Sequence, residues 1–151
     1  MVAQPPSFDG FLRQRGYDPA NSVAFLRRMF VDCWSQPSFR AFWRVWNPVY
    51  GYALFRLYLA LGGQQRPRLA SLVVFVACGA LLHDLPMALA TGQPFFSTTV
   101  AFLVYGAMVA WERPGNQPPR HPAANNVARI VLGLAVGAAV QSLVLFSWPA
   151  P

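Results

Sequence analysis

The sequence predicts an all-α integral membrane protein, in which three to four transmembrane helices follow amphipathic helices that lie in the membrane interface. Three observations predict this class. Hydrophobic residues make up 55% of the 151 residues and charged residues only 11%, whereas soluble domains are about 25% charged. The mean hydropathy is +0.34. The basic residues flank long apolar segments, and the length leaves little room for a second domain.

The net charge of +7 comes from twelve arginines against five acids, and the chain has no lysine. A complete absence of lysine is typical of a biased genomic base composition, so the choice of arginine carries no functional argument. Because the arginines flank apolar segments, we expect them to face lipid headgroups and do not expect nucleic acid as a partner. We expect a bacterial inner-membrane protein with its Arg-rich N-terminal region in the cytoplasm.

Residues 1 to 17 contain prolines and glycines without a sustained period, which predicts a flexible N-terminal tail. Residues 18 to 46 are predicted to form interfacial amphipathic helices. The first begins at Asp18, which can cap a helix that has Pro19 at its first position. Apolar residues then recur at spacings of three and four, as in a helix on the bilayer surface. A helix that packs in a soluble environment is the alternative.

Ser38 can cap a second short helix, whose aromatic residues and arginines suit the headgroup layer. The helical membrane domain is predicted over residues 47 to 151, with apolar segments at about 48–61, 69–90, 95–111 and 127–148. A spanning helix needs about 20 residues, so the second and fourth segments qualify and the third is at the short limit. The first is short and carries Arg56 in its middle. The charge rule favours three spans plus one tilted or re-entrant segment, and four spans remain the alternative.

Small residues mark one face of the fourth apolar segment. Gly133 and Gly137 are four residues apart, and Gln141 follows one turn later. Small residues at that spacing let helix backbones approach closely, and a buried amide can form hydrogen bonds across the contact. We expect a packing face, through which a homo-oligomer or another membrane partner can bind.

His83 and Asp84 are ionisable residues in an apolar segment, which is costly in a bilayer and indicates function. A histidine that bonds a neighbouring carbonyl and holds helices together is the alternative. In an antiparallel helical hairpin, residues equidistant from the turn lie level, and this predicts that Asn47 lies beside His83. A neutral imidazole can act as a general base toward an alcohol. An amide can position the substrate or stabilise negative charge.

Two other kinds of site are not expected. Cys78 lies five residues before His83, which in an α-helix turns the two side chains roughly 140° apart around the axis. A covalent route through Cys78 is therefore unfavourable, and Cys33 and Cys78 are interpreted as small hydrophobic residues without a disulfide. Two dispersed histidines predict no metal site.

A series of polar and aromatic motifs resembles the membrane-bound O-acyltransferase (MBOAT) superfamily, especially its sterol and diacylglycerol O-acyltransferases and wax synthases. The family motifs are F-Y-x-D-W-W-N, F-W-x-x-W-N-x-P-V-H, R-H-x-Y and S-A-x-x-H-E. The segments that resemble them here are Met29-Phe30-Val31-Asp32-Cys33-Trp34-Ser35, Phe42-Trp43-Arg44-Val45-Trp46-Asn47-Pro48-Val49-Tyr50, Arg56-Leu57-Tyr58 and Cys78-Gly79-Ala80-Leu81-Leu82-His83-Asp84. The chain lacks one residue between Asn47 and Pro48, and it resembles only the motif-bearing half of this family.

The resemblance implies that His83 is the catalytic base and Asn47 its polar partner. It implies acyl-CoA or another acyl thioester as co-substrate, no tightly bound cofactor, and a lipid-like alcohol in the bilayer as acceptor. The residues that it places at the substrates are Asp32, Trp34, Trp43, Trp46, Tyr50, Arg56 and Asp84. The alternative, suggested by the short chain, is a non-catalytic membrane subunit or a lipid-binding module of a larger complex. Without the partner motif around His83, the segment Trp43-Arg44-Val45-Trp46 would be interpreted as an anchor in the membrane interface.

Overall fold

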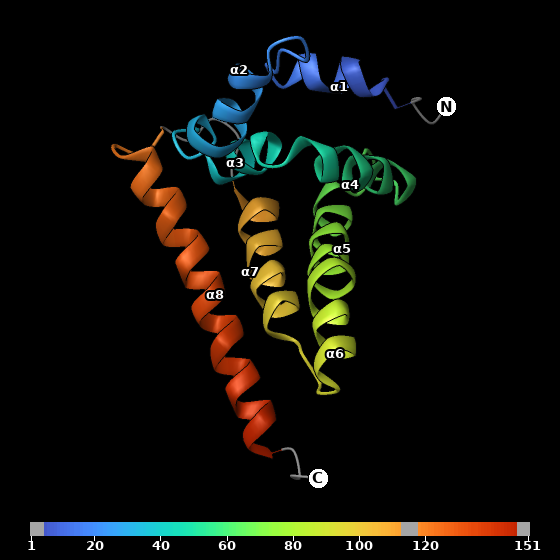
Figure 1. Cartoon of the computed structure of the whole chain (residues 1–151), viewed down its shortest axis with the longest axis vertical. Coiled ribbons are helices and arrows are strands. Elements are labelled where there is room, and N and C mark those ends of the chain that lie inside the picture. The colour runs from blue at the N-terminus through green and yellow to red at the C-terminus, as the bar shows by residue number, and fades with distance from the viewer. Residues whose placement is uncertain (1–4, 113–117, 148–151) are drawn as a thin grey trace.

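The computed structural model describes residues 5–112 and 118–147, and all regular elements in these residues are helices. Figure 1 shows two groups of helices, one lying across an end of the other. The first group, called the cross layer here, contains α1 (Phe8–Gln14), α2 (Ser22–Arg27), the π-helical turn η1 (Arg28–Asp32), α3 (Phe39–Val45) and α4 (Pro48–Ala60). The second, called the long-helix layer, contains α5 (Pro67–Gly79), the π-helical turn η2 (Ala80–Asp84), α6 (Leu85–Thr91), α7 (Ser97–Trp111) and α8 (Pro122–Ser147).

Two helices of the long-helix layer are long and apolar enough to cross a membrane. They are Pro67–Thr91, which joins α5, η2 and α6, and Pro122–Phe146 in α8, each with a mean hydropathy of 2.0. A core helix of a soluble protein would be mostly buried, but only 22% and 17% of these two segments are buried in the fold. The all-α class is confirmed, because all regular elements of the described residues are helices. The two long apolar helices indicate membrane association. The number of spans and the interfacial position of the cross layer stay predictions.

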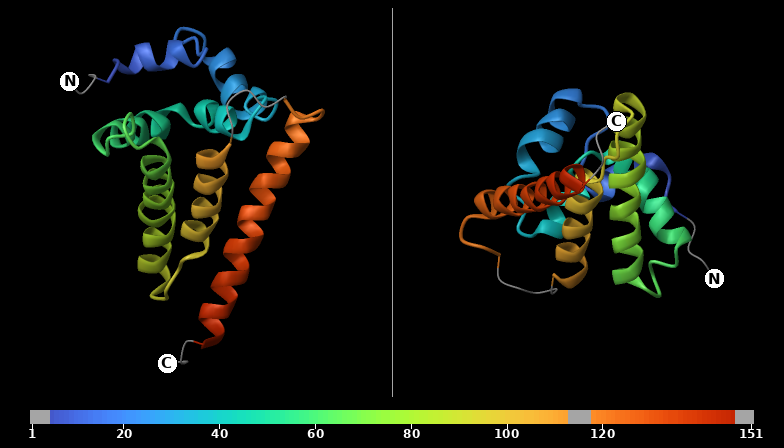
Figure 2. Two further views of the ribbon diagram at one scale, coloured as in Figure 1. Left: turned by 180° about the vertical axis from the view of Figure 1, so that it is seen from behind. Right: turned by 90° about the horizontal axis from the view of Figure 1, so that it is seen from below.

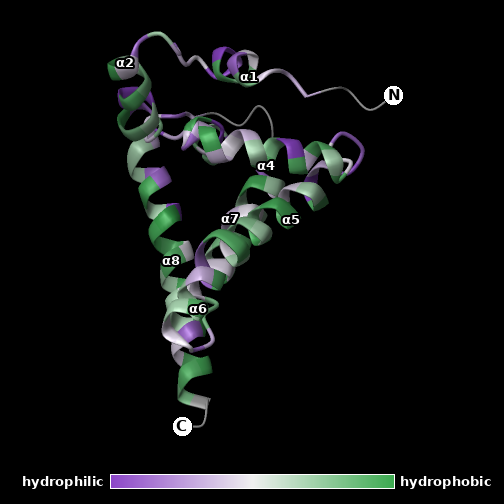
Figure 3. Ribbon diagram, turned by 45° about the vertical axis from the view of Figure 1, so that its right-hand side comes forward, coloured by the Kyte–Doolittle hydropathy of each residue, from purple (hydrophilic) through white to green (hydrophobic). Residues whose placement is uncertain are grey.

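α4 is the helix that connects the two layers, and it lies across the end of α5 (Figures 1 and 2). The antiparallel hairpin that would bring Asn47 level with His83 is therefore wrong. The arginines of the described residues all lie in the cross layer or near the ends of α5 and α8 beside it. Figure 3 shows the hydrophilic residues gathered mainly at this end of the molecule. This is the one-sided charge distribution expected when the segment 48–61 does not cross.

The N-terminal segment differs from the predicted flexible tail. Residues 8 to 14 form α1, whose first turn is capped by the Ser7 hydroxyl, 3.2 Å from the backbone nitrogen of Gly10. Phe11 is fully buried, and its ring lies 5.1 Å from that of Tyr52 on α4. The Tyr17 hydroxyl donates a hydrogen bond to the carbonyl of Val45 at the end of α3. Aromatic side chains therefore fix residues 8–17 on the cross layer.

The other helices of the cross layer begin at residues with capping side chains. α2 starts later than predicted, because the Asn21 side chain caps it and Asp18 instead accepts a hydrogen bond from Ala20 within the preceding turn. Asn and Asp are equally strong capping residues, so the sequence alone does not rank them. Ser38 caps α3 as predicted. The apolar residues of α2 are packed only in part, since Phe25 contacts the ring of Tyr17 whereas Val23 remains 78% exposed.

The three helices of the long-helix layer pack through glycines. A Cβ atom on Gly79 would lie 2.7 Å from the Cα atom of Thr99, and one on Gly137 would lie 2.1 Å from the carbonyl oxygen of Ser97. A Cβ atom on Gly133 would meet the ring of Tyr105. The predicted Gly133/Gly137 packing face therefore exists, but α7 of the same chain covers it. Binding of a homo-oligomer or another partner through that face is not compatible with this packing.

Glu112 joins the two layers at the end of α7. Its carboxylate accepts hydrogen bonds from the backbone nitrogens of Phe39 and Arg40, at 3.1 and 2.8 Å, and pairs with Arg129 of α8 at 2.7 Å. The Arg40 guanidinium in turn donates to the carbonyls of Val109 and Glu112. Burial alone would raise the pKa of Glu112, but these hydrogen bonds outweigh it and hold the pKa below the ordinary value of 4.5.

The Glu112 contacts predict a pH dependence of stability. A depressed pKa in the fold stabilises it above the ordinary pKa of 4.5, and this contribution is lost as the pH falls through the lower pKa of the folded state. Glu112→Gln is therefore expected to have a lower unfolding temperature than the parent at pH 7. The difference between the two unfolding temperatures should become smaller in acid, where the parent loses the contribution of the Glu112 carboxylate. Thermal unfolding in uncharged detergent measures this. The control is Asp9→Asn, because Asp9 is exposed and forms no ion pair with a described residue. A constant difference between Glu112→Gln and parent across this range would contradict the prediction.

Candidate functional site

A cavity of about 840 Å³ lies between the cross layer and the long-helix layer, and both Asn47 and His83 line it. Its walls come from the end of α1, from α3 and α4, and from α5, η2 and α7. The volume is within the range of about 300–1,000 Å³ that is usual for small-molecule sites. Two residues that are far apart in sequence thus contribute to one cavity, although the hairpin expected to join them is not formed.

The cavity is apolar over most of its wall and basic toward the cross layer. Trp43, Phe75 and Phe102 lie on its apolar part, and their rings contact one another at centroid distances of 5.2 to 6.2 Å. Arg44 of the cross layer and Arg68, at the end of α5 beside it, line the other part. Arg68 lies fifteen residues before His83 on the same continuous helix, which is about 22 Å along its axis. The cavity therefore suits an amphiphilic ligand with a negatively charged end.

His83 lies on η2, the π-helical turn between α5 and α6. The cause of the turn is Pro86, which has no N–H for the carbonyl four residues before it. The Leu85 nitrogen instead bonds to the carbonyl of Ala80, five residues before it. Such turns within α-helices often occur at functional sites.

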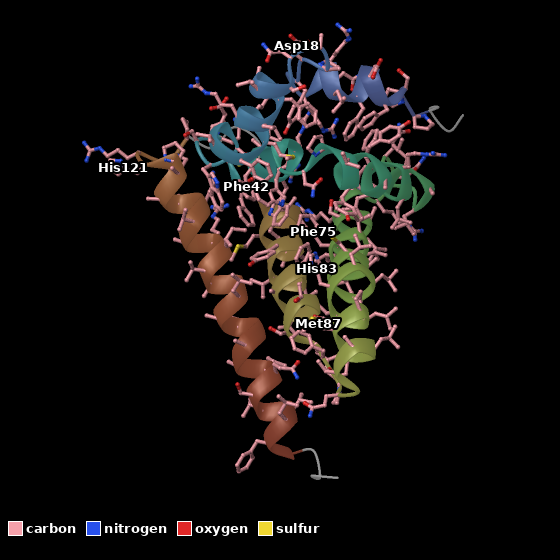
Figure 4. The ribbon with its side chains drawn as sticks, viewed as in Figure 1. Asp18, Phe42, Phe75, His83, Met87 and His121 are labelled. Atoms are coloured by element: carbon pink, nitrogen blue, oxygen red, sulfur yellow. The ribbon has the colours of Figure 1, made fainter. Side chains whose placement is uncertain are left out.

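The His83 side chain lies between the ribbons of α5 and α7 in Figure 4, and its ring centroid is 5.3 Å from that of Phe102. The imidazole forms no hydrogen bond or ion pair with a described residue, and the side chain is exposed at the cavity. A histidine that holds helices together through a carbonyl therefore has no support in this part of the chain. Its nitrogen atoms are free to contact a ligand.

Cys78 lines the same cavity as His83, although the spacing of the two residues in a regular α-helix would turn their side chains apart. The angle of roughly 140° assumes a regular α-helix. η2 begins two residues after Cys78, at Ala80, and its hydrogen bonds join residues five apart, so it is wound more widely than an α-helix. The angular argument against a role for Cys78 thus fails. Cys33 and Cys78 are both free and buried, as expected.

Asn47 forms the turn between α3 and α4. Its φ angle of +43° is the only positive one of a described residue other than glycine, and asparagine tolerates this left-handed region well. Pro48 disfavours the right-handed helical conformation at Asn47. The amide oxygen accepts a hydrogen bond from Tyr50 and caps α4 at 3.4 Å, whereas the NH2 group forms no hydrogen bond with a described residue. Asn47 is therefore a capping residue with one free donor group at the cavity.

The structure brings some of the other predicted residues to the cavity and leaves others outside. Trp43, Trp46 and Tyr50 line it. The indole nitrogen of Trp43 is buried without a hydrogen-bond acceptor among the described residues. Such an unsatisfied donor is uncommon, but because the atom is buried it is not exposed to a ligand in the cavity.

Asp32, Trp34 and Arg56 do not line the cavity. Asp32 pairs with Arg27 at 3.5 Å on the surface of the cross layer. The Trp34 indole donates to the carbonyl of Phe30, at 3.1 Å, and its ring packs against the ring of Phe42 on α3. Arg56 is exposed on α4. Since each has a position outside the cavity, no direct contact of these three residues with a ligand there is supported.

Asp84 has a different role from the one expected, because it caps α7. Its carboxylate oxygens accept hydrogen bonds from the backbone nitrogens of Thr98, at 3.0 Å, and Thr99, at 2.5 Å. The residue is only 3% exposed and does not line the cavity. A carboxylate is favourable at a helix N-terminus, where backbone N–H groups lack partners within the helix. The negative charge in this apolar segment is therefore explained by the start of the neighbouring helix.

Some cavity residues were not found by sequence reasoning. Phe75 and Phe102 belong to apolar segments in which no local pattern distinguishes a wall residue from a lipid-facing one. Arg15 lies in the predicted tail, and Arg68 stands beside a turn. No group of three histidine, cysteine or acidic side chains suited to a metal occurs in residues 5–112 and 118–147.

Comparisons of the chain with protein-family models, with curated proteins and with solved structures find no match. The resemblance to the MBOAT superfamily thus rests on the four sequence motifs. Of those motifs, the second and fourth contribute Asn47 and His83 to the cavity.

Proposed function

We propose that this protein is a membrane O-acyltransferase of the MBOAT type, with His83 as general base and Asn47 as its polar partner. The observation that carries the proposal is the single amphiphilic cavity lined by both residues. The two long, outward-facing apolar helices support an integral membrane protein. With the arginines at one end, the charge rule favours the cross layer on the cytoplasmic side.

In the proposed reaction, His83 takes the proton of the acceptor hydroxyl as the oxygen attacks the thioester carbonyl. The new C–O bond forms while the C–S bond breaks, and the proton on the imidazole passes to the leaving thiolate. The products are an ester and a free thiol, and the imidazole returns to its neutral form. Asn47 has an unused NH2 group at the cavity, and it would stabilise the negative charge on the carbonyl oxygen.

The substrate classes follow from the two ends of the cavity. An acyl chain fits the aromatic part, where its burial contributes about 0.8 kcal/mol for each CH2 group. The phosphate groups of an acyl-CoA donor would lie toward the cross layer, near Arg68. A lipid-like alcohol in the bilayer is the proposed acceptor, and His83 is the residue that its hydroxyl would have to reach.

An acyl-transfer assay tests the proposal. The purified full chain is reconstituted in liposomes with a radiolabelled long-chain acyl-CoA and a long-chain alcohol, and both the labelled ester and the released thiol are quantified. The expected result is equal amounts of the two products. Thiol release without an ester would indicate hydrolysis only. Neither product across a series of donors and alcohols would contradict the transferase.

A lipid-binding module is the second candidate, and one observation favours it. Asp84 is committed to α7, so no carboxylate among the described residues orients the imidazole of His83. Many histidine bases are held by such a partner. This candidate predicts that an acyl-CoA or a lipid raises the unfolding temperature of the protein without being converted. The transferase predicts both binding and conversion.

A further inference from the structure

A second, smaller cavity lies within the cross layer and collects three arginines. Its volume is about 240 Å³, and Arg15, Arg28 and Arg44 line it together with Gln14 and Gln36. Arg15 and Arg44 also line the first cavity, whereas Arg28 lines the second cavity alone. The arginines come from the residue after α1, from η1 and from α3. Folding of the cross layer thus brings together three positive charges that are separate in the sequence.

Two of these arginines are held in place by other contacts. The Nε atom of Arg28 donates to the carbonyl of Arg15 at 2.7 Å. The guanidinium carbon of Arg15 lies 3.5 Å from the centroid of the Phe11 ring. These contacts restrain the two guanidinium groups and leave some of their N–H groups for a ligand. Such preorganisation lowers the entropy that a ligand must offset.

No carboxylate among the described residues compensates the three charges. The two ion pairs in this part of the chain are Arg27–Asp32 and Arg129–Glu112. Arg44 forms no hydrogen bond with a described residue. Burial, and then the charge of Arg44, lower the pKa of Arg15 to about 10. The folded protein therefore retains repulsion between neighbouring guanidinium groups, which a bound anion would relieve.

We infer that Arg15, Arg28 and Arg44 form a binding site for a phosphate group in this second cavity. Guanidinium groups bind phosphate oxygens through paired, charge-assisted hydrogen bonds, and arginine is the preferred residue for this geometry. The elements that carry these arginines belong to the cross layer, at the end of the molecule where the hydrophilic residues mainly gather (Figure 3). An anionic phospholipid headgroup and a free phosphate anion share the required chemistry. The inference does not depend on acyl transfer.

Binding by matched variants tests this site on the purified full chain in uncharged detergent. Native mass spectrometry measures retention of phosphatidylglycerol against phosphatidylcholine, and thermal unfolding measures stabilisation by inorganic phosphate. Arg44→Gln and Arg28→Gln are each expected to weaken binding of the preferred probe about tenfold, as for loss of one charge-assisted hydrogen bond. Arg27→Gln is the control, because Arg27 is adjacent, exposed and paired with Asp32. It is expected to change binding by less than about twofold.

The two probes identify the source of the phosphate. Preference for phosphatidylglycerol, with weak competition by inorganic phosphate, supports a lipid headgroup. Stabilisation by inorganic phosphate that is lost in Arg28→Gln, without a lipid preference, supports a free anion. Equal losses in Arg27→Gln and Arg28→Gln would overturn the site in favour of diffuse charge attraction. Binding of neither probe would also overturn it. Arg28 provides the decisive variant, because it lines the second cavity and not the first, and the unfolding temperature of each variant without a probe shows that it is folded.

Discussion

Replacement of His83 by glutamine is expected to lower the rate of acyl transfer about 10²- to 10⁴-fold, the usual contribution of a general base. Glutamine keeps a polar side chain of similar length but cannot accept and return a proton at neutral pH. The unfolding temperature should stay close to that of the parent, because His83 is exposed at the cavity and forms no hydrogen bond with a described residue. Initial rates of ester and thiol formation, at saturating acyl-CoA, measure the effect.

His121→Gln is the matched control, since His121 is the other histidine of the chain. His121 is exposed just before α8, and Figure 4 places it far from His83. We expect parental activity in this variant. A His83→Gln protein as fast as the parent would contradict the role of general base even if the parent transfers acyl groups. Cys78 would then become the nearest candidate for chemistry in the cavity, because it is a nucleophilic side chain on the same wall.

The fold is predictable from sequence where the signal is local. The apolar segments predicted at 48–61, 69–90 and 95–111 correspond to α4, to the helix Pro67–Thr91 and to α7. α8 begins somewhat before the predicted segment at 127–148, since its first turn is polar. The position of α4 across the end of α5 is compatible with the charge rule, which favours a segment 48–61 that does not cross the membrane. Hydrophobicity and charge are summed over whole segments, so a prediction based on them does not depend on the correct assignment of any single residue.

The angle at which helices cross is not a local property, and this limited the prediction of the site. Counting residues from a turn aligns Asn47 with His83 only if both arms are antiparallel. α4 instead lies across the end of α5, so its residues are not level with those of α5. The angle expected between Cys78 and His83 assumed a regular α-helix. Pro86 was the sequence signal against this assumption, because it stands within the apolar segment and predicts an interruption of the helix. That interruption is what allows Cys78 and His83 to line one cavity.

Asp84 shows why an ionisable residue in an apolar segment does not by itself identify a catalytic site. Its partners, Thr98 and Thr99, are fourteen and fifteen residues later, beyond a turn. α7 has Phe96 at its N-cap position and no capping side chain of its own. A helix that begins in apolar surroundings needs acceptors for its first N–H groups. An uncapped start after a turn, together with an acid at the start of the helix that precedes that turn, was therefore the sequence signal for a structural role.

Replacement of Asp84 by alanine is expected to destabilise the protein by about 4 kcal/mol, because two buried backbone N–H groups each lose an acceptor at a cost of about 1–3 kcal/mol. This is a large fraction of the 5–15 kcal/mol that is usual for a folded domain. Asp84→Asn keeps one acceptor oxygen and should have an intermediate effect. Unfolding by denaturant in mild detergent measures the loss, and hydrogen exchange should be fastest at the amides of Thr98 and Thr99.

Asp18→Ala is the control for this prediction, since Asp18 also accepts a backbone hydrogen bond but lies in an exposed turn where water can replace it. Equal unfolding midpoints for the two alanine variants would contradict the capping role. Acyl transfer by Asp84→Ala distinguishes capping from catalysis. If Asp84 acts only as a cap, it holds η2 against α7 and thereby keeps His83 beside Phe102. The rate of Asp84→Ala should then recover toward that of the parent at low temperature, where α7 is folded. A residue that takes part in the proton transfer would leave the rate low at every temperature, and Asp84 would then return to the catalytic site.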